Sequence, residues 1–220
     1  MNKQIQSGQT ILFVGDSITD CDRRDPVHAP LGRGFVRQLR DLFVVRHPDL
    51  ALHFINRGIG GNTVDDLRSR WQDDVLAHRP DHLVVQVGMN DLNQFLCRPD
   101  RAFLAPDGYA EIYDSLLVRT RAAFPELPIL LMSSFLISTD TAEGSYRARL
   151  LQHLPSYINA VRAIATAHGA DHLDLHALFQ GRLVHDHPDR YCDEPIHPNI
   201  TGHALIADAV FNHFTRVGQG

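Results

Sequence analysis

The chain has 220 residues, of which 44% are hydrophobic and 21% are charged, and its net charge at pH 7 is -5. This length and composition are typical of one globular domain with a substantial core. The acidic balance, without any cluster of lysine and arginine, argues against nucleic-acid binding, and no apolar run approaches the ~20 residues that a membrane span needs.

The N-terminus and the cysteines bear on where the protein works. Residues 1–9 lack the apolar core of a signal peptide. Cys21, Cys97 and Cys192 are odd in number and widely spaced, and the chain has no C-x-x-C pair. We therefore expect no disulfide framework and a location in the reducing cytoplasm.

Histidine is frequent, with 14 residues, and His185-Asp186-His187 forms the densest cluster. The neighbouring Pro188-Asp189 favours a polar loop over a metal site for this cluster. No pair of histidines has the spacing of an H-E-x-x-H metal motif. We expect neither a metal nor another cofactor.

The first predicted strand is the apolar run at 11–14, which stops at Gly15-Asp16-Ser17. In open α/β sheets the C-terminal ends of the strands are where ligands bind. A serine at that position is either a nucleophile or only a turn former or helix cap. A polar loop follows, from Cys21 to Arg33.

Apolar runs and turn residues predict the remaining elements in chain order. Further strands are expected at 52–55, 82–87, 128–132 and 172–175. Helices are expected from Phe35 to His47, from Val64 to Arg79, around 109–117, around 157–165, at 178–183 and from near Thr201. Thr63 is the expected cap of the second helix, and Trp71 the expected core residue on its apolar stripe. These elements are connected by a glycine-rich turn at 56–63, a turn at 88–91, a polar segment at 138–149 and loops at 92–106 and 184–199. The 92–106 loop is long enough to act as a lid.

Five strands that alternate with helices predict a parallel sheet covered on both faces, a three-layer α/β/α sandwich formed by one domain over residues 1–220. Right-handed crossovers place all the C-terminal strand ends at one edge. Several polar residues should therefore meet there, together with residues of the loop before the last helix. They are Ser17, Gly60, Gly61, Asn62, Asn90, Asp91, Asp193, Glu194 and His197.

This set contains what acyl transfer requires. A serine needs a base within hydrogen-bond reach, and histidine is the usual one. A carboxylate orients that histidine, and backbone or amide N–H groups stabilise the oxyanion. Each residue also has an ordinary explanation as a turn or cap, so the inference depends on all of them falling at one edge.

Four blocks, G-D-S-I-T-D, G-I-G-G-N-T, G-M-N-D and H-P-N, resemble in sequence and order the four blocks of the GDSL/SGNH hydrolase family. The resemblance implies the flavodoxin-like fold of that family and makes Ser17 the nucleophile and His197 the base. It also implies that the oxyanion is bound by the N–H groups of Ser17 and Gly61 and by the side chain of Asn90. The absence of a G-x-S-x-G elbow separates the chain from the α/β-hydrolases.

The triad acid departs from the family pattern. The family has an aspartate three residues before the histidine, whereas this chain has Glu194 there and Asp193 one residue earlier. A glutamate serves this role in other triads. We predict Glu194 as the acid, with Asp193 as the alternative.

The longer run around Gly61, N-R-G-I-G-G-N-T-V-D-D-L-x-x-R-W-Q-D-D-V, is similar to the acetylxylan esterase-like bacterial branch of the family. That similarity implies a small intracellular esterase, often oligomeric, that removes acetyl groups from sugars. The partners expected are an acetylated sugar and a second copy of the chain, with no membrane. The alternatives are a lipid-directed hydrolase such as a lysophospholipase or thioesterase, and a binding module without activity.

Further residues are weaker candidates for the pocket. Asp16 adjoins the nucleophile and has a structural explanation as an anchor of the turn. Asn62, Phe135 and Tyr191 could border the site, although aromatic residues at loop edges often only fill the core.

Overall fold

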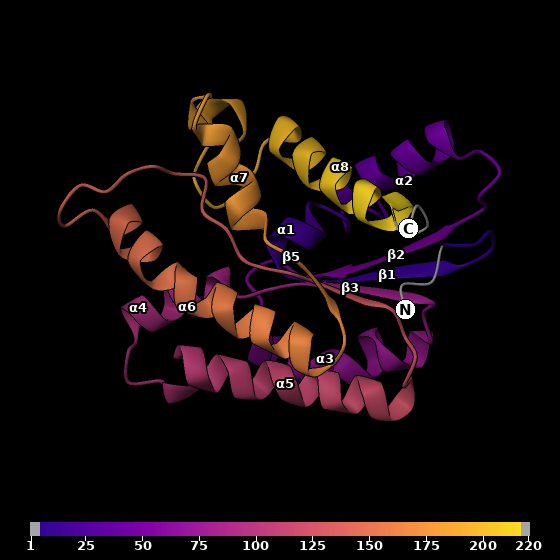
Figure 1. Cartoon of the computed structure of the whole chain (residues 1–220), viewed down its shortest axis with the longest axis horizontal. Coiled ribbons are helices and arrows are strands. Elements are labelled where there is room, and N and C mark those ends of the chain that lie inside the picture. Colours follow the sequence, from indigo (N-terminus) through magenta and orange to yellow (C-terminus); the bar gives the residue numbers. More distant parts are fainter. Residues whose placement is uncertain (1–4, 217–220) are drawn as a thin grey trace.

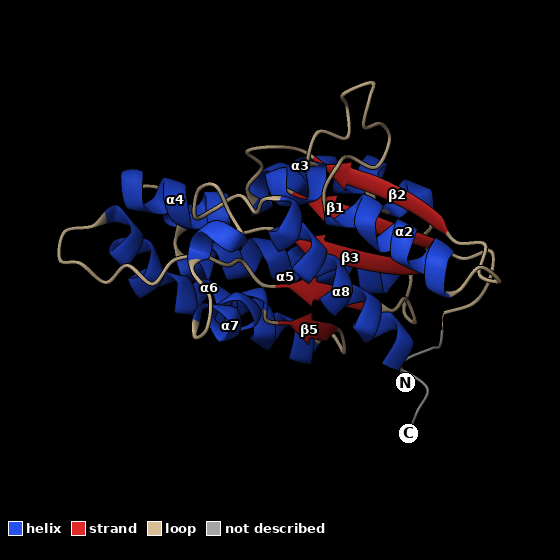
Figure 2. Ribbon diagram, turned by 90° about the horizontal axis from the view of Figure 1, so that it is seen from above, coloured by secondary structure: helices blue, strands red, loops and turns tan. Residues whose placement is uncertain are grey.

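The computed structural model describes residues 5–216 of the chain. Its centre is a five-stranded parallel sheet with the strand order β2-β1-β3-β4-β5. The strands are β1 (Thr10–Gly15), β2 (His53–Gly58), β3 (His82–Gln86), β4 (Ile129–Met132) and β5 (Asp171–Leu173). The arrowheads of the strands labelled in Figure 2 point the same way, so their C-terminal ends share one edge. This is the predicted α/β sandwich.

Helices cover both faces of the sheet (Figure 1). One layer contains α3 (Val64–Asp74), α4 (Met89–Cys97), α5 (Pro106–Ala123) and α6 (Tyr146–Ala167). The other contains α2 (Phe35–Arg46), α7 (Leu175–Leu183) and α8 (Ile200–Arg216). A four-residue helix, α1 (Ser17–Asp20), follows β1, and short 3₁₀ turns occur at Leu76–His78, Ala102–Leu104 and Pro188–Arg190.

The side chains of β1 alternate between two cores, as a strand buried on both faces requires. Leu12 and Val14 pack with the layer of α3, α5 and α6. Ile11 and Phe13 pack with the layer of α2, α7 and α8. Trp71 is fully buried in the first core, and its indole N–H donates to Thr120 Oγ1 at 3.0 Å.

The prediction of a loop over 92–106 is wrong. Helix α4 begins at Met89 inside the expected turn and continues to Cys97, and a 3₁₀ turn follows at Ala102–Leu104. Met89 and Leu92 are buried and Leu96 packs against the same core, so an apolar face with helical spacing outweighs the polar turn residues around them.

Other boundaries differ by a few residues. Helix α6 begins at Tyr146, within the expected polar segment, and continues through Pro155 because Leu150 and Leu154 are buried against the core. Strand β2 extends to Gly58, so the first three residues of the expected glycine-rich turn, 56–58, are strand. Residues 1–4 of the N-terminal segment lie outside the described residues. None of the helices between residues 5 and 216 is long and apolar enough to cross a membrane.

Candidate active site

Ser17 is separated from the end of β1 only by Asp16 and is the first residue of α1. The turn before it is tight, since a Cβ on Gly15 would lie 2.1 Å from the carbonyl oxygen of Gln86. Asp16 caps the short helix, and its Oδ1 accepts from the backbone N–H of Ile18 at 3.0 Å. The strand end and the cap together present Ser17 at the C-terminal edge of the sheet.

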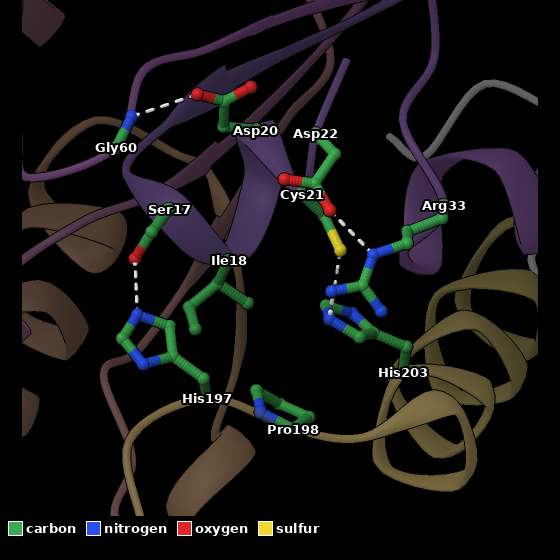
Figure 3. A pocket seen from close by; sticks show the side chains of 10 residues that line it. All are labelled: Ser17, Ile18, Asp20, Cys21, Asp22, Arg33, Gly60, His197, Pro198 and His203. Carbon is green, nitrogen blue, oxygen red and sulfur yellow. Dashed lines mark hydrogen bonds and ion pairs between the residues drawn. The ribbon is translucent and has the colours of Figure 1, made fainter. Parts of the chain in front are cut away.

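The side chain of Ser17 meets that of His197, which belongs to the loop before α8. Ser17 Oγ and His197 Nε2 are 2.8 Å apart, and Figure 3 shows the serine oxygen facing the imidazole. On the other side of the ring, His197 Nδ1 is hydrogen-bonded to Glu194 Oε1. The three side chains form a continuous hydrogen-bonded chain, which is the arrangement that a serine nucleophile with a histidine base requires.

The Glu194 carboxylate is held by its own loop. Its Oε2 accepts from the N–H of Ile196 and its Oε1 from the N–H of His197, both at 2.9 Å. These bonds fix the longer arm of the glutamate against the ring. Asp193 is exposed, and none of the hydrogen bonds described for His197 involves it. Of the two candidate acids, the structure brings only Glu194 to the histidine.

The loop after β2 carries the predicted oxyanion donor Gly61. Its φ of +82° is a left-handed conformation that favours glycine, and a Cβ there would meet no atom within 4 Å. The neighbouring Gly60 lies close to Ser17, since a Cβ on Gly60 would be 3.8 Å from Ser17 Cβ. The loop therefore passes close to Ser17, and no other atom crowds Gly61 on the side where a Cβ would lie.

Two residues after β3 bind this loop. Asn90 Nδ2 donates to the carbonyl oxygen of Asn62 at 3.0 Å, and Asp91 Oδ1 accepts from the N–H of Val64 at 3.0 Å. An amide nitrogen has two protons, so the bond to Asn62 leaves one proton of Asn90 for a ligand. Asn90 thus joins the loop after β2 and can still act as a donor.

Arg70 of α3 joins the ends of β1 and β2. Its Nε donates to Asn62 Oδ1 at 2.8 Å, and its Nη2 donates to the carbonyl oxygen of Gly15 at 3.0 Å. Its Nη1 donates to the carbonyl oxygen of Arg57 at 2.7 Å and to Asp74 Oδ2 at 2.6 Å. One guanidinium therefore connects the end of β1, just before Ser17, with the loop that carries Gly61.

Two buried carboxyl groups, those of Asp16 and Asp91, lie near Ser17 in the structure. Burial raises the pKa of Asp16 to about 7, and the backbone bond from Ile18 only partly opposes this. Burial likewise raises the pKa of Asp91 to about 7, despite the bond from Val64, and the charge of Asp16 adds to the effect. Both groups are capping residues, and each carries a proton over part of the physiological pH range.

A cavity of about 260 Å³ opens beside Ser17 (Figure 3). Besides Ser17 and His197, its walls include the polar side chains of Asp20, Asp22, Arg33 and His203. We call it the Ser17 cavity. Ile18, Cys21 and Pro198 add apolar surface to these walls, so the lining mixes charged, polar and apolar groups.

Cys21 also lines this cavity, 3.4 Å from His203 Nε2. His203 Nδ1 accepts from the N–H of Phe35, so the proton of the neutral ring is on Nε2 and points to the sulfur. Burial lowers the pKa of His203 to about 4 and raises that of the Cys21 thiol. His203 is thus no base for Cys21, and the thiol stays protonated. Within residues 5–216, no group of three His, Cys, Asp or Glu side chains could hold a metal ion.

A sequence model described as the GDSL-like Lipase/Acylhydrolase family matches residues 13–205, which include Ser17, Gly61, Asn90 and His197. The chain belongs to this family. As a GDSL-like acylhydrolase it is a carboxylic ester hydrolase.

Individual relatives agree with this assignment. The chain is 32% identical over 214 residues to an acetylxylan esterase of Geobacillus stearothermophilus, and the match covers 94% of each chain. A crystal structure of Axe2, an acetylxylan esterase from the same organism, has a TM-score of 0.85 at 30% identity over 97% of each chain. LAE5, an alpha/beta hydrolase enzyme from the metagenome of Lake Arreo in Spain, has a TM-score of 0.83 at 30% identity over 98% of this chain and 99% of its own.

The solved structures of Axe2 include catalytic mutants in which a serine, an aspartate or a histidine is replaced by alanine. In the GDSL-like acylhydrolase described here, the acid that contacts the histidine is a glutamate. The longer side chain is accommodated because both of its oxygens accept backbone N–H groups of the same turn.

The weaker candidates from the sequence lie in the framework. Phe135 is buried in the core with its ring centroid 4.8 Å from that of Phe179. Tyr191 is buried and its hydroxyl donates to Asp186 Oδ2 at 2.6 Å. Asp16 is buried and caps α1, and Asn62 accepts from Arg70. None of these four residues lines the Ser17 cavity.

Sequence reasoning missed Arg70 and the charged cavity wall formed by Asp22 and Arg33. Arg70 is part of the long run similar to the acetylxylan esterase-like branch, and its position one residue before the buried Trp71 was the available signal. The cavity wall falls in the polar segment from Cys21 to Arg33, where no periodic pattern marks individual residues.

Proposed function

We propose that this acylhydrolase removes acetyl groups from carbohydrates, with acetylated xylo-oligosaccharides as its substrate class. The observation that carries the proposal is the hydrogen-bonded chain from Ser17 through His197 to Glu194. The activity named for the relatives, acetylxylan esterase, supplies the substrate class by analogy.

The proposed reaction has two halves. His197 Nε2 takes the proton of Ser17 as the serine oxygen attacks the ester carbonyl, and Glu194 stabilises the imidazolium that forms. The tetrahedral intermediate collapses when His197 gives this proton to the alcohol oxygen, which leaves an acetyl-enzyme. Water, deprotonated by His197, then attacks the acetyl carbonyl, and acetate leaves as Ser17 regains its proton.

The negative oxygen of both tetrahedral intermediates needs fixed donors. The N–H groups of Ser17 and Gly61 and the side-chain amide of Asn90 are the donors we propose, each worth on the order of 3 kcal/mol in the transition state. Bonds from Asn90 and Arg70 to Asn62 support this role because they hold the residue after Gly61 at its carbonyl and at its side chain.

The Ser17 cavity favours a sugar over a lipid. Its walls carry Asp22, Arg33 and His203, whose polar groups would lose hydration without compensation against an alkyl chain. This argues against the lysophospholipase or thioesterase alternative. Cys21, Cys97 and Cys192 are all free thiols, which supports action in the reducing cytoplasm on small oligosaccharides. Assembly into a homo-oligomer stays a prediction, which light scattering in solution tests.

The decisive experiment is acetate release from acetylated xylo-oligosaccharides by the wild-type chain and by Ser17→Ala, alongside p-nitrophenyl esters of increasing chain length. We expect acetate release that falls by several orders of magnitude in the variant, and a steep fall in rate beyond butyrate. Cleavage of the aryl esters with inert sugars would move the substrate elsewhere. Near-wild-type turnover in Ser17→Ala would refute the serine mechanism.

A further inference from the structure

One wall of the Ser17 cavity carries an ion pair with unused hydrogen-bonding capacity. Arg33 Nε donates to Asp22 Oδ2 at 2.5 Å, and the two side chains are 59% and 52% exposed. Both line the cavity that contains Ser17 and His197 (Figure 3). The hydrogen bond described for the Arg33 side chain uses only Nε, so both terminal nitrogens of the guanidinium are available to a ligand.

The backbone holds this pair in place. The N–H of Arg33 donates to the carbonyl oxygen of Cys21 at 2.8 Å. Glycines flank Arg33 because a Cβ on Gly32 would lie 2.5 Å from that same oxygen, and one on Gly34 would lie 2.7 Å from the Cβ of Cys21. The segment that carries Arg33 is thus pressed against the residue that precedes Asp22.

The Asp22 side of the wall has an unusual backbone. Cys21 and Asp22 are successive non-glycine residues with positive φ, at 36° and 65°. Positive φ at residues other than glycine is uncommon and clusters at catalytic sites and ligand clamps. The Arg33 segment packs against this stretch through its bond to the Cys21 carbonyl oxygen.

The position of the Asp22–Arg33 pair beside Ser17 and His197 indicates which part of the ester it contacts. In the proposed mechanism the alcohol leaves with the proton of His197, so the alcohol must lie beside that ring. His197 lines the Ser17 cavity, whereas two of the three proposed oxyanion donors, Gly61 and Asn90, do not; the third is Ser17 itself. The cavity therefore receives the alcohol part of the ester. Its volume of about 260 Å³ lies just below the roughly 300 to 1,000 Å³ of sites for drug-sized ligands, which suits a single sugar ring.

The chemistry of the pair matches a sugar ring. Adjacent hydroxyl groups can donate to a carboxylate and accept from a guanidinium at the same time, and both bonds are of the stronger, charge-assisted kind. We propose that Asp22 and Arg33 bind neighbouring hydroxyls of the sugar whose acetyl ester is cleaved, and so determine the preference for carbohydrate esters. This inference rests on the proposed function and adds the residues that select the alcohol.

The test compares two esters of the same acid on purified full-length protein. One is a monoacetylated methyl xyloside, and the other is phenyl acetate, whose alcohol has no further hydroxyl. The variants are Asp22→Asn, since asparagine tolerates a positive φ, and Arg33→Met, which keeps the length of the side chain. Arg68→Met is the matched control, because Arg68 forms an exposed ion pair with Asp65 outside the cavity.

We expect Asp22→Asn and Arg33→Met each to lower kcat/KM for the xyloside ester by roughly tenfold or more, chiefly through KM. Hydrolysis of phenyl acetate should stay close to that of the wild type, which also shows that the variants are folded. Arg68→Met should have the wild-type kcat/KM for both esters.

Equal losses on both esters would overturn the inference, because they would mean that the pair only shapes the loop behind the nucleophile. Unchanged rates on the xyloside ester would overturn it as well. A wild-type protein that cleaves phenyl acetate but no acetylated sugar would refute the proposed function and this inference together. The activity of the wild-type protein on the acetylated sugar therefore tests the proposed function. The ratio of kcat/KM for the xyloside ester to kcat/KM for phenyl acetate, measured in the variants, tests the role of the ion pair.

Discussion

The two halves of the active site are built differently. On the serine side, Asp16 and Asp91 are buried at 1% and 0% exposure, and Arg70 binds two strand ends and the side chain of Asn62. On the histidine side, the side chains of His197 and Glu194 are about half exposed, at 54% and 48%, and their contacts come mainly from their own turn.

The ends of the histidine turn are nevertheless fixed. The carbonyl oxygen of Pro195 accepts from the N–H of Ile137, and the N–H of Asn199 donates to the carbonyl oxygen of Tyr191. Cys192 and Pro198 form an isolated antiparallel bridge. His197 thus belongs to a surface turn that is held at both ends, whereas Ser17 belongs to the edge of the sheet. Substitutions on the serine side should therefore cost stability as well as activity, and those on the histidine side activity alone.

The largest effect expected on the histidine side follows from replacing the acid. Glu194→Ala should lower kcat by a factor on the order of 10⁴, because the imidazole loses the partner that fixes its tautomer. The midpoint of thermal unfolding should hardly change, since an exposed substitution typically alters stability by about 0.5 kcal/mol or less. Steady-state kinetics and calorimetry on the same samples provide both values.

Asp193→Ala is the matched control for this prediction, because Asp193 is the adjacent, exposed carboxylate. It should retain activity near that of the wild type. A greater loss in Asp193→Ala than in Glu194→Ala would show that the turn rearranges during the reaction and that Asp193 is the acid.

A smaller loss of activity, but a measurable loss of stability, is expected for Arg70→Lys. Lysine keeps the charge but cannot bind Asn62, Gly15 and Arg57 at once. We expect kcat to fall by a factor on the order of 10², with KM little changed, because a displaced Gly61 weakens transition-state binding. The free energy of unfolding should fall by about 1–3 kcal/mol.

Arg57→Lys is the control for Arg70, since the Arg57 side chain also binds Asp74, with Nε 2.8 Å from Oδ1, but has no hydrogen bond to Asn62 or Gly15. Its kcat should stay near the wild-type value. If kcat falls equally in both variants, the ion pairs with Asp74, and not the contact with Asn62, support the site. If Arg70→Lys lowers the free energy of unfolding but not kcat, Arg70 has no positioning role.

The smallest effect concerns the pH dependence of stability. The pKa of Asp91 is about 7 in the folded protein against 3.8 as its ordinary value. Between these values the unfolded chain loses the proton and the folded protein keeps it, so stability falls as the pH rises from about 4 to about 7 and is level above. Each such group contributes a slope on the order of 1 kcal/mol per pH unit.

Asp91→Asn should make this slope shallower without abolishing it, because Asp16 titrates in the same window. Denaturant unfolding at pH 5, 6, 7 and 8 measures the slope. An unchanged slope in Asp91→Asn would mean that Asp91 is ionised in the folded protein.

The parts of the molecule that sequence patterns predicted are those with a regular period or a short motif. The strands and most helices have continuous apolar runs or stripes. Three of the four blocks lie at the ends of β1, β2 and β3, and the fourth lies in the loop before α8. Helix α4 was missed because its first turn contains Asn90 and Asp91, which are typical of turns, and only its packing against the core shows that Met89, Leu92 and Leu96 share a face.

The choice between Glu194 and Asp193 shows a second limit. Both are acidic, adjacent and in a loop without periodicity, so composition cannot rank them. The structure separates them through backbone N–H groups of Ile196 and His197, which bind the longer side chain. Arg70 is similar, because its role depends on the carbonyl oxygens of Gly15 and Arg57 and on the side chain of Asn62, which meet only in the folded protein.

The most direct test of the central claim is to label the protein with a fluorophosphonate and to locate the adduct by peptide mass spectrometry. Attack by the serine oxygen on phosphorus expels fluoride and leaves a stable phosphonate ester. We predict a single adduct on Ser17 in the wild-type protein, with labelling slowed by orders of magnitude in His197→Ala. An unlabelled wild-type protein, or an adduct on another residue such as Cys21, would contradict the account.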